Sequence, residues 1–147
     1  MKKATAAILF ASLALLSACG ETSYADGVYT ARSEVYEGLL DESGDEGGDG
    51  YGVVTLTIRD GAIADCEFTT YMTDGTVKDA DYGKRGGEIA NQDYYNKAQR
   101  AVQASANYAE QLKAKGDPKA VDAISGATIS YNEFQDAVAA ALDQAAK

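Results

Sequence analysis

Apolar and polar residues alternate from residue 54 to residue 69, and this pattern limits the possible folds more than any other feature of the chain. A period of two is typical of a β-strand with one buried face. The dipeptide Asp60–Gly61 interrupts the alternation midway, and such a pair favours the tight turn of a β-hairpin. The apolar positions are Val54, Leu56 and Ile58 before the turn, and Ala64, Cys66 and Phe68 after it. The sequence therefore predicts an antiparallel hairpin with one apolar face that needs a cover.

Two helices are predicted in the C-terminal half to supply that cover. The first spans Gln92–Lys115, where small or apolar residues recur at steps of three and four. They are Tyr94, Ala98, Ala101, Ser105, Tyr108 and Leu112. Gly116 provides the stop, because glycine readily adopts the left-handed conformation that follows many helices. Asp117 and Pro118 then fit the cap and first residue of one short helical turn.

The second helix is expected from Tyr131 to about Ala145. Its apolar side carries Phe134, Val138, Ala141 and Leu142. Ser130 and Glu133 have the spacing of a capping box, in which the two side chains satisfy backbone N–H groups at the start of a helix. The pattern therefore predicts that the helix begins directly after Ser130.

A further strand is predicted at Val28–Tyr36, after a turn at Asp26–Gly27. The acidic stretch 41–50 and the glycine-rich stretch Gly83–Gly87 are predicted to be exposed loops. Strands that precede two amphipathic helices favour an α+β fold, with a twisted, antiparallel-rich sheet and both helices packed on one face.

The N-terminus has the pattern of a bacterial lipoprotein signal. Two lysines precede an apolar stretch, residues 4–16, that is too short to span a bilayer. Leu16–Cys19 fits a lipobox, in which Cys19 is acylated and becomes the first residue of the mature protein. This divides the chain into a signal peptide (1–18), a lipid-anchored tether (19–26) and one domain (27–147). The tether reaches about 25 Å at most, so we expect the domain to lie close to the extracytoplasmic side of the cell membrane.

Composition excludes several kinds of chemistry. The chain has no histidine, which rules out a Ser-His-Asp triad, a histidine-ligated haem and a histidine-containing zinc site. Once Cys19 is acylated, Cys66 is the one remaining thiol, so an internal disulfide or a CxxC redox pair is impossible. A calcium loop that starts at Asp41 or at Asp45 lacks the required combination of glycine and bidentate glutamate, and no metal site is predicted. The formal net charge of −10 disfavours nucleic acid and anionic lipid headgroups as partners. Redox work by this chain would need an imported electron carrier.

The segment from Asp122 to Thr128 reads Asp-Ala-Ile-Ser-Gly-Ala-Thr and is the strongest candidate for a functional site. Thr128 lies just before the predicted second helix, where free backbone N–H groups and the positive end of the helix dipole suit a phosphate. Gly126 can adopt a positive φ, and without a Cβ it lets a ligand or a modifying enzyme come close.

This segment resembles the Asp-x-x-Ser-Gly-Ala-Thr motif of the FMN-binding domain family, and the resemblance extends from about Asp26 to Leu142. The family includes the C subunit of sodium-translocating NADH:quinone reductase, the G subunit of Rnf complexes and flavinylated lipoproteins of extracellular electron transfer, to which the chain is most similar. The resemblance implies that Thr128 carries FMN through a phosphoester bond. The recognition part of the motif corresponds to Asp122, Ser125, Gly126 and Ala127. Tyr131 is expected to be the tyrosine best placed to stack on the isoalloxazine ring, ahead of Tyr82 and Tyr51.

The resemblance also implies a function and partners. A separate magnesium-dependent flavin transferase would move FMN from FAD onto the threonine. The protein would then act as an electron carrier, rather than as an enzyme with its own substrate, between a membrane quinol or flavoprotein and an extracellular or periplasmic acceptor. Two alternatives stay open: a surface solute-binding lipoprotein without flavin, marked by an apolar pocket remote from Thr128, and a domain that holds FMN non-covalently.

Overall fold

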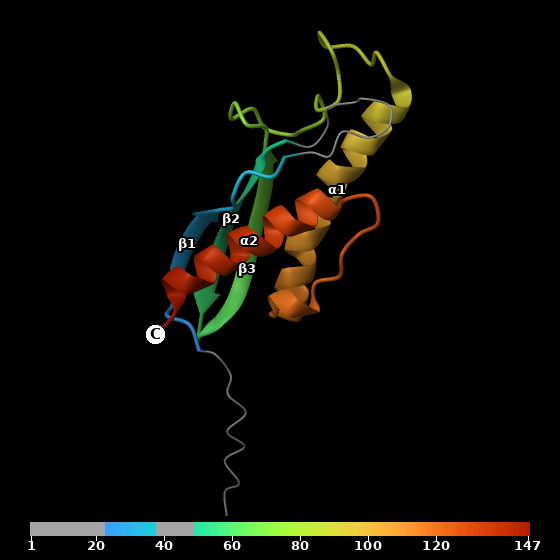
Figure 1. Ribbon diagram of the computed structural model, residues 1–147. Coiled ribbons are helices and arrows are strands. Elements are labelled where there is room, and N and C mark those ends of the chain that lie inside the picture. The colour runs from blue at the N-terminus through green and yellow to red at the C-terminus, as the bar shows by residue number, and fades with distance from the viewer. Residues whose placement is uncertain (1–22, 38–48) are drawn as a thin grey trace, which may run out of the picture.

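The computed structural model describes residues 23–37 and 49–147, and this part of the chain confirms the predicted α+β fold. Its three strands form one antiparallel sheet in the order β1-β2-β3, and two long helices cover one face of that sheet (Figure 1). The elements are β1 Gly27–Arg32, β2 Tyr51–Arg59, β3 Ala62–Tyr71, α1 Gln92–Lys115, the 3₁₀ turn η1 Pro118–Ala120 and α2 Thr128–Ala145. The predicted signal peptide, Cys19 and nearly all of the acidic loop lie outside the described residues.

The predicted hairpin is formed by β2 and β3, with one irregularity. Thr57 pairs with Asp65, whereas Ile58 pairs with Ile63, so a β-bulge leaves Ala64 without a direct partner. A bulge offsets the in-and-out alternation of side chains on its two sides by one residue. Ile63 is therefore buried and Ala64 exposed, and the prediction that Ala64 belongs to the apolar face is wrong.

The strand β1 is shorter than the predicted Val28–Tyr36, because its regular ladder with β2 ends at Arg32. Looser pairing continues beyond it. The backbone N–H of Ser33 donates to the carbonyl of Gly52 at 2.8 Å, and Tyr36 forms an isolated bridge with Gly50. The chain thus stays beside β2 past the end of the strand.

The helix α1 has the predicted bounds. Asn91 caps its start, since the side chain accepts a hydrogen bond from the N–H of Tyr94 at 3.0 Å. Gly116 ends it with a φ of 68°, and its N–H donates to the carbonyl of Leu112. The expected short turn follows, with Asp117 accepting from the N–H of Lys119 at 2.9 Å.

The core lies between the sheet and the two helices, with α1 packed on β3 and α2 on β1 and β2. Its centre is aromatic: the ring of Phe134 lies 5.1 Å from that of Phe68 and 5.7 Å from that of Tyr108, centre to centre. Cys66 is part of the same core, and burial raises the pKa of its thiol to about 12. Because the thiolate is the reactive form, this cysteine is a packing residue.

The residues just before β1 already belong to the folded domain. The N–H of Tyr24 donates to the carbonyl of Gly61 at 3.1 Å, and the N–H of Ala25 donates to that of Ala145 at 2.8 Å. The chain therefore enters the domain beside the C-terminal end of α2, as Figure 1 shows. Tyr24 and Ala25, which lie within the predicted tether 19–26, are thus hydrogen-bonded to the folded domain.

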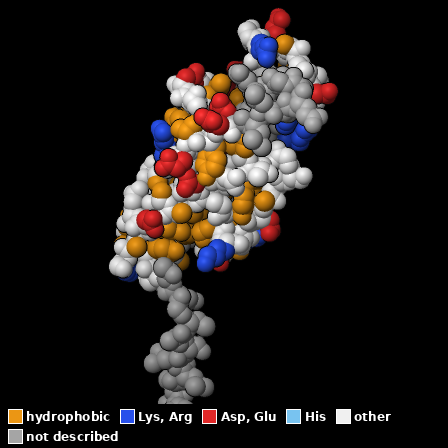
Figure 2. All heavy atoms as spheres, viewed as in Figure 1, with side chains coloured by type: hydrophobic (Ala, Val, Ile, Leu, Met, Phe, Trp, Pro, Cys, Tyr) orange, Lys and Arg blue, Asp and Glu red, His pale blue; other side chains and the backbone are white. Residues whose placement is uncertain are grey.

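The surface of the domain carries interspersed charges. On the face that α2 forms, acidic side chains lie among apolar and basic ones, so the net negative charge is not gathered into one patch there (Figure 2). Within residues 23–37 and 49–147, neither helix is apolar enough over a sufficient length to cross a bilayer.

Candidate functional site

The helix α2 begins at Thr128, so the prediction of a start at Tyr131 with a capping box is wrong. Ala127 occupies the N-cap position, and its carbonyl accepts the helical hydrogen bond from the N–H of Tyr131 at 3.0 Å. Ser130 and Glu133 lie inside the helix on its buried face, where they are 6 % and 0 % exposed. Ala127 and Glu133 instead contact residues far away in the sequence, Tyr108 and Lys78 respectively.

Thr128 follows a tight turn and is presented to solvent. The N–H of Ala127 donates to the carbonyl of Ile124 at 3.1 Å, and Gly126 between them has a φ of 81°. A Cβ placed on Gly126 would meet no atom within 4 Å, so the space beside the turn is open. Ser125 and Thr128 are exposed, while Ala127 is buried at 3 % and anchors the turn. We call residues 124–128 the SGAT turn.

The SGAT turn has the features that a phosphate requires. With Thr128 as its first residue, α2 starts with backbone N–H groups that have no partner within the first turn of a helix. The alanine at the N-cap supplies no side-chain acceptor for them. Such groups, together with the helix dipole, attract an anion. A phosphate ester on the exposed hydroxyl of Thr128 would lie beside them, so these residues fit FMN.

The hydroxyl of Tyr108, on α1, bridges two residues of the SGAT turn. It accepts a hydrogen bond from the N–H of Ile124 at 3.0 Å and donates one to the carbonyl of Ala127 at 3.2 Å. The side chain of Tyr108 is fully buried. Sequence reasoning missed this role, since periodicity identified Tyr108 only as a core residue. The available signal was its hydroxyl, because a buried tyrosine O–H usually needs a partner.

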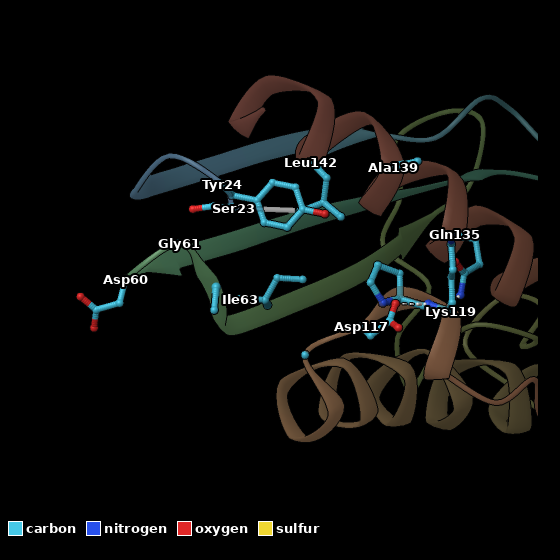
Figure 3. A pocket seen from close by; sticks show the side chains of 13 residues that line it. Ser23, Tyr24, Asp60, Gly61, Ile63, Asp117, Lys119, Gln135, Ala139 and Leu142 are labelled. Atoms are coloured by element: carbon cyan, nitrogen blue, oxygen red, sulfur yellow. Dashed lines mark hydrogen bonds between the residues drawn. The ribbon is translucent and has the colours of Figure 1, made fainter. Parts of the chain in front are cut away.

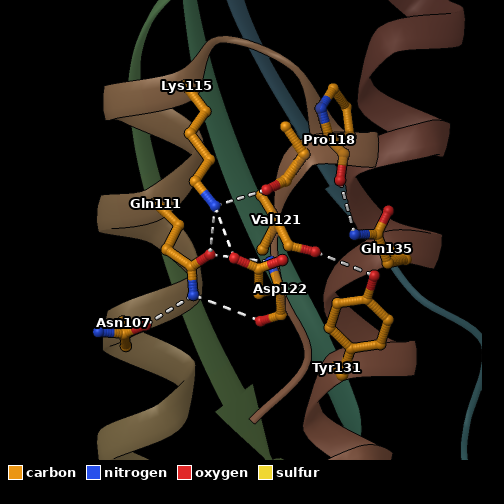
Figure 4. A network of polar contacts seen from close by, with 9 residues as sticks. Asn107, Gln111, Lys115, Pro118, Val121, Asp122, Tyr131 and Gln135 are labelled. Carbon is orange, nitrogen blue, oxygen red and sulfur yellow. Dashed lines mark hydrogen bonds and ion pairs between the residues drawn. The ribbon is translucent and has the colours of Figure 1, made fainter.

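Asp122 ties the start of the motif to α1. Its N–H donates to the side-chain carbonyl of Gln111 at 2.8 Å, and its carboxylate pairs with the ammonium group of Lys115 at 2.9 Å (Figure 4). Lys115 also donates to the carbonyl of Ala120 at 2.6 Å. Because the carboxylate of Asp122 is exposed, the ion pair itself contributes little stability. The network instead fixes the path of the chain from the end of α1 to the SGAT turn.

Tyr131 supports the same segment from α2. Its ring is half-buried and packs edge-on against that of Tyr108, with 5.4 Å between the centres. Its hydroxyl donates to the carbonyl of Val121 at 3.2 Å. The structure thus places the side chain of Tyr131 against Val121, directly before the motif, where it supports the connecting chain. Its expected stacking on a flavin ring stays a prediction.

The two other candidate tyrosines have partners away from the motif. Tyr51 stacks on Tyr71 with 5.4 Å between the ring centres, and the guanidinium of Arg32 lies 4.2 Å from the centre of the Tyr51 ring. Tyr82 lies beside Lys78, whose ammonium nitrogen is 5.3 Å from the ring centre.

Glu133 forms a buried ion pair that the sequence did not reveal. One of its carboxylate oxygens lies 3.8 Å from the ammonium nitrogen of Lys78, and the side chains are 0 % and 5 % exposed. Neither oxygen of Glu133 has a hydrogen-bond partner within the described residues. Burial raises the pKa of Glu133 to about 7, and attraction to Lys78 opposes the shift only in part. Burial likewise lowers the pKa of Lys78. The sequence did carry a signal for the burial of Glu133, because this residue lies four positions before Ala137, on the same buried face of α2.

A cavity of about 830 Å³ lies farther along α2, towards its C-terminal half (Figure 3). It is bounded by the segment before β1, the β2–β3 turn, the end of α1 with η1, and α2. The lining residues are Ser23, Tyr24, Asp60, Gly61, Ala62, Ile63, Gly116, Asp117, Pro118, Lys119, Gln135, Ala139 and Leu142. None of them belongs to the SGAT turn. The lining includes the charged residues Asp60, Asp117 and Lys119 beside apolar ones.

Comparisons with known proteins agree with the motif and the fold. The family model described as an FMN-binding domain matches residues 47–143, which is more than half of the chain and includes the SGAT turn. Among solved structures, the CPE2226 protein of Clostridium perfringens is similar in fold, with a TM-score of 0.56 and 19 % sequence identity over 83 % of this chain and 88 % of that one. A protein of Clostridium thermocellum, solved by NMR, has 24 % identity over 81 % and 90 % of the two chains and a TM-score of 0.38. The comparison with curated proteins found no match.

Proposed function

This chain belongs to the FMN-binding domain family, and we propose that it carries FMN covalently on the hydroxyl of Thr128. The observation that supports the site is the exposed position of Thr128 as the first residue of α2, directly after a turn with open space beside Gly126. In the transfer, the Thr128 oxygen bonds to the FMN phosphorus of FAD, the pyrophosphate bond breaks, AMP leaves and the hydroxyl proton is lost. A flavin transferase that requires Mg²⁺ would catalyse this step.

The proposed role is that of an electron carrier on the outer side of the cell membrane, anchored through lipid on Cys19. A membrane quinol or flavoprotein would supply the electrons, and an extracellular or periplasmic acceptor would take them. Bound FMN would supply the capacity to accept and release electrons, chemistry that proteins usually obtain from a cofactor. A covalent bond suits this location, because a flavin that dissociates outside the cell is lost by dilution.

The direct test is the mass of the domain after incubation with a flavin transferase, FAD and Mg²⁺. We expect the wild-type domain to gain the mass of one FMN minus one water, and Thr128→Ala to gain nothing. Trypsin should place the added mass on the C-terminal peptide, residues 120–147, which contains Thr128. Because Ser125 and Ser130 are on the same peptide, fragmentation must locate the modified residue within it.

Ser130→Ala is the matched control, since it removes a nearby hydroxyl that is 94 % hidden from solvent by the fold, against the exposed hydroxyl of Thr128. That variant should still gain one FMN. Retention of the added mass by Thr128→Ala would contradict the proposed acceptor. A yellow protein that loses its flavin on denaturation would favour non-covalent FMN, and a wild-type domain that takes up no flavin in either form would favour the solute-binding alternative.

A further inference from the structure

We propose that Tyr108 is a positioning residue for the modification of Thr128. Its hydroxyl holds the SGAT turn in the shape that presents Thr128 to the transferase. This inference rests on the proposed function, because it concerns the same acceptor. It goes beyond that function by assigning a role to a residue of α1 that lies outside the motif.

Two hydrogen bonds carry the argument. The Tyr108 hydroxyl joins the N–H of Ile124 to the carbonyl of Ala127, so it spans the turn from its first residue to the residue before Thr128. The bond between Ile124 and Ala127 closes the same turn through the backbone. Loss of the Tyr108 oxygen would leave the N–H of Ile124 without the one acceptor that the structure gives it among the described residues. A turn closed by one bond instead of three samples more conformations.

The ring of Tyr108 is buried and packs against two rings of α2, which makes its hydroxyl a rigid support. It lies edge-on to Tyr131 at 5.4 Å and tilted against Phe134 at 5.7 Å, and none of its surface is exposed. Burial raises the pKa of the Tyr108 hydroxyl, so it keeps the proton that it donates to Ala127. A phenylalanine would fill the same space and retain both ring contacts. The variant Tyr108→Phe therefore removes the support of the turn with little change to the core.

The test compares Tyr108→Phe with Tyr29→Phe. The control also removes one tyrosine hydroxyl that donates to a backbone carbonyl, that of Ala25 at 2.9 Å, but at the other end of α2. With transferase, FAD and Mg²⁺, we expect kcat/KM for FMN incorporation to fall about tenfold in Tyr108→Phe and to stay at the wild-type value in Tyr29→Phe. In the flavin-free proteins, amide hydrogen exchange at residues 124–128 should be faster in Tyr108→Phe alone.

Each outcome decides the question. An unchanged kcat/KM for Tyr108→Phe would overturn the positioning role, whether or not amide exchange is faster. A wild-type domain that accepts no FMN would overturn the proposed function and this proposal with it, which separates the two failures. Should Tyr108→Phe be unfolded by circular dichroism, Ile124→Pro removes the donor of the same hydrogen bond. The proposal expects reduced kcat/KM for that variant as well, and a wild-type value would overturn it.

Discussion

Replacement of Phe134 by alanine should lower the free energy of unfolding by about 3 to 5 kcal/mol, the usual cost of truncating a buried aromatic residue. Phe134 is fully buried on α2 and contacts Phe68 of β3 and Tyr108 of α1. It therefore joins the three elements that enclose the core. Domains of this size are stable by only about 5 to 15 kcal/mol, so the variant should be close to unfolding.

Urea denaturation at constant pH is the measurement, and Val28→Ala is the control. Val28 lies on β1 with 66 % of its surface exposed, so its truncation should change the free energy of unfolding by less than about 0.5 kcal/mol. A loss below 1 kcal/mol in Phe134→Ala, with an unchanged dependence on urea, would show that the aromatic cluster is not the centre of the core.

The second large effect is a dependence of stability on pH that comes from Glu133. The pKa of this carboxyl is about 7 in the folded domain, against a reference value of 4.5 for the unfolded chain. Its contribution to stability is complete below pH 4.5 and is lost as the pH rises to about 7, because the unfolded chain releases the proton first. Between pH 5 and pH 8 the wild-type domain should lose roughly 2 to 3 kcal/mol for this reason.

Glu133→Gln removes the titrating group while keeping the shape of the side chain. The variant differs in absolute stability at any one pH, because Lys78 loses its ion pair with Glu133, but it should not show the loss between pH 5 and pH 8. Asp49 and Asp136 near the pair are present in both proteins. Burial and the nearby carboxylates, Glu133 among them, raise the pKa of Tyr36 above its usual value, so its hydroxyl stays protonated between pH 5 and pH 8 in both proteins. Glu67→Gln, on the exposed side of β3, should follow the wild-type curve. Parallel curves for wild type and Glu133→Gln would contradict the shifted pKa.

Local patterns in the sequence were sufficient for much of the fold. The helix Gln92–Lys115 has the predicted bounds, because the spacing of its apolar residues and the glycine that ends it are both local features of the sequence. The same holds for the β2–β3 hairpin with its turn at Asp60–Gly61. The motif from Asp122 to Thr128 was also recognisable, since its residues are contiguous, and the family match confirms the kind of domain it belongs to.

The errors arose where residues far apart in the sequence decide the local structure. At the start of α2, the N-cap residue Ala127 accepts a hydrogen bond from Tyr108, which lies 19 positions earlier in the sequence. Glu133 was assigned to a capping box by its spacing from Ser130, but its charge is directed at Lys78 in the segment after β3. The bulge at Ala64 likewise depends on how β3 pairs with β2. None of these partners can be chosen from a single sequence before the fold is known.

The docking of Tyr24 and Ala25 against the end of α2 has a consequence for how far the protein reaches. The chain enters the domain beside Ala145 and Ala146, while Thr128 is the first residue of the same helix. At 1.5 Å per residue, the 18 residues of α2 separate Thr128 from the place where the chain enters the domain by about 27 Å. With the proposed lipid on Cys19, a domain that stands upright would hold the proposed flavin on Thr128 well clear of the headgroups. The proposed electron donor would then have to project that far above the bilayer or meet a domain that has tilted onto its side.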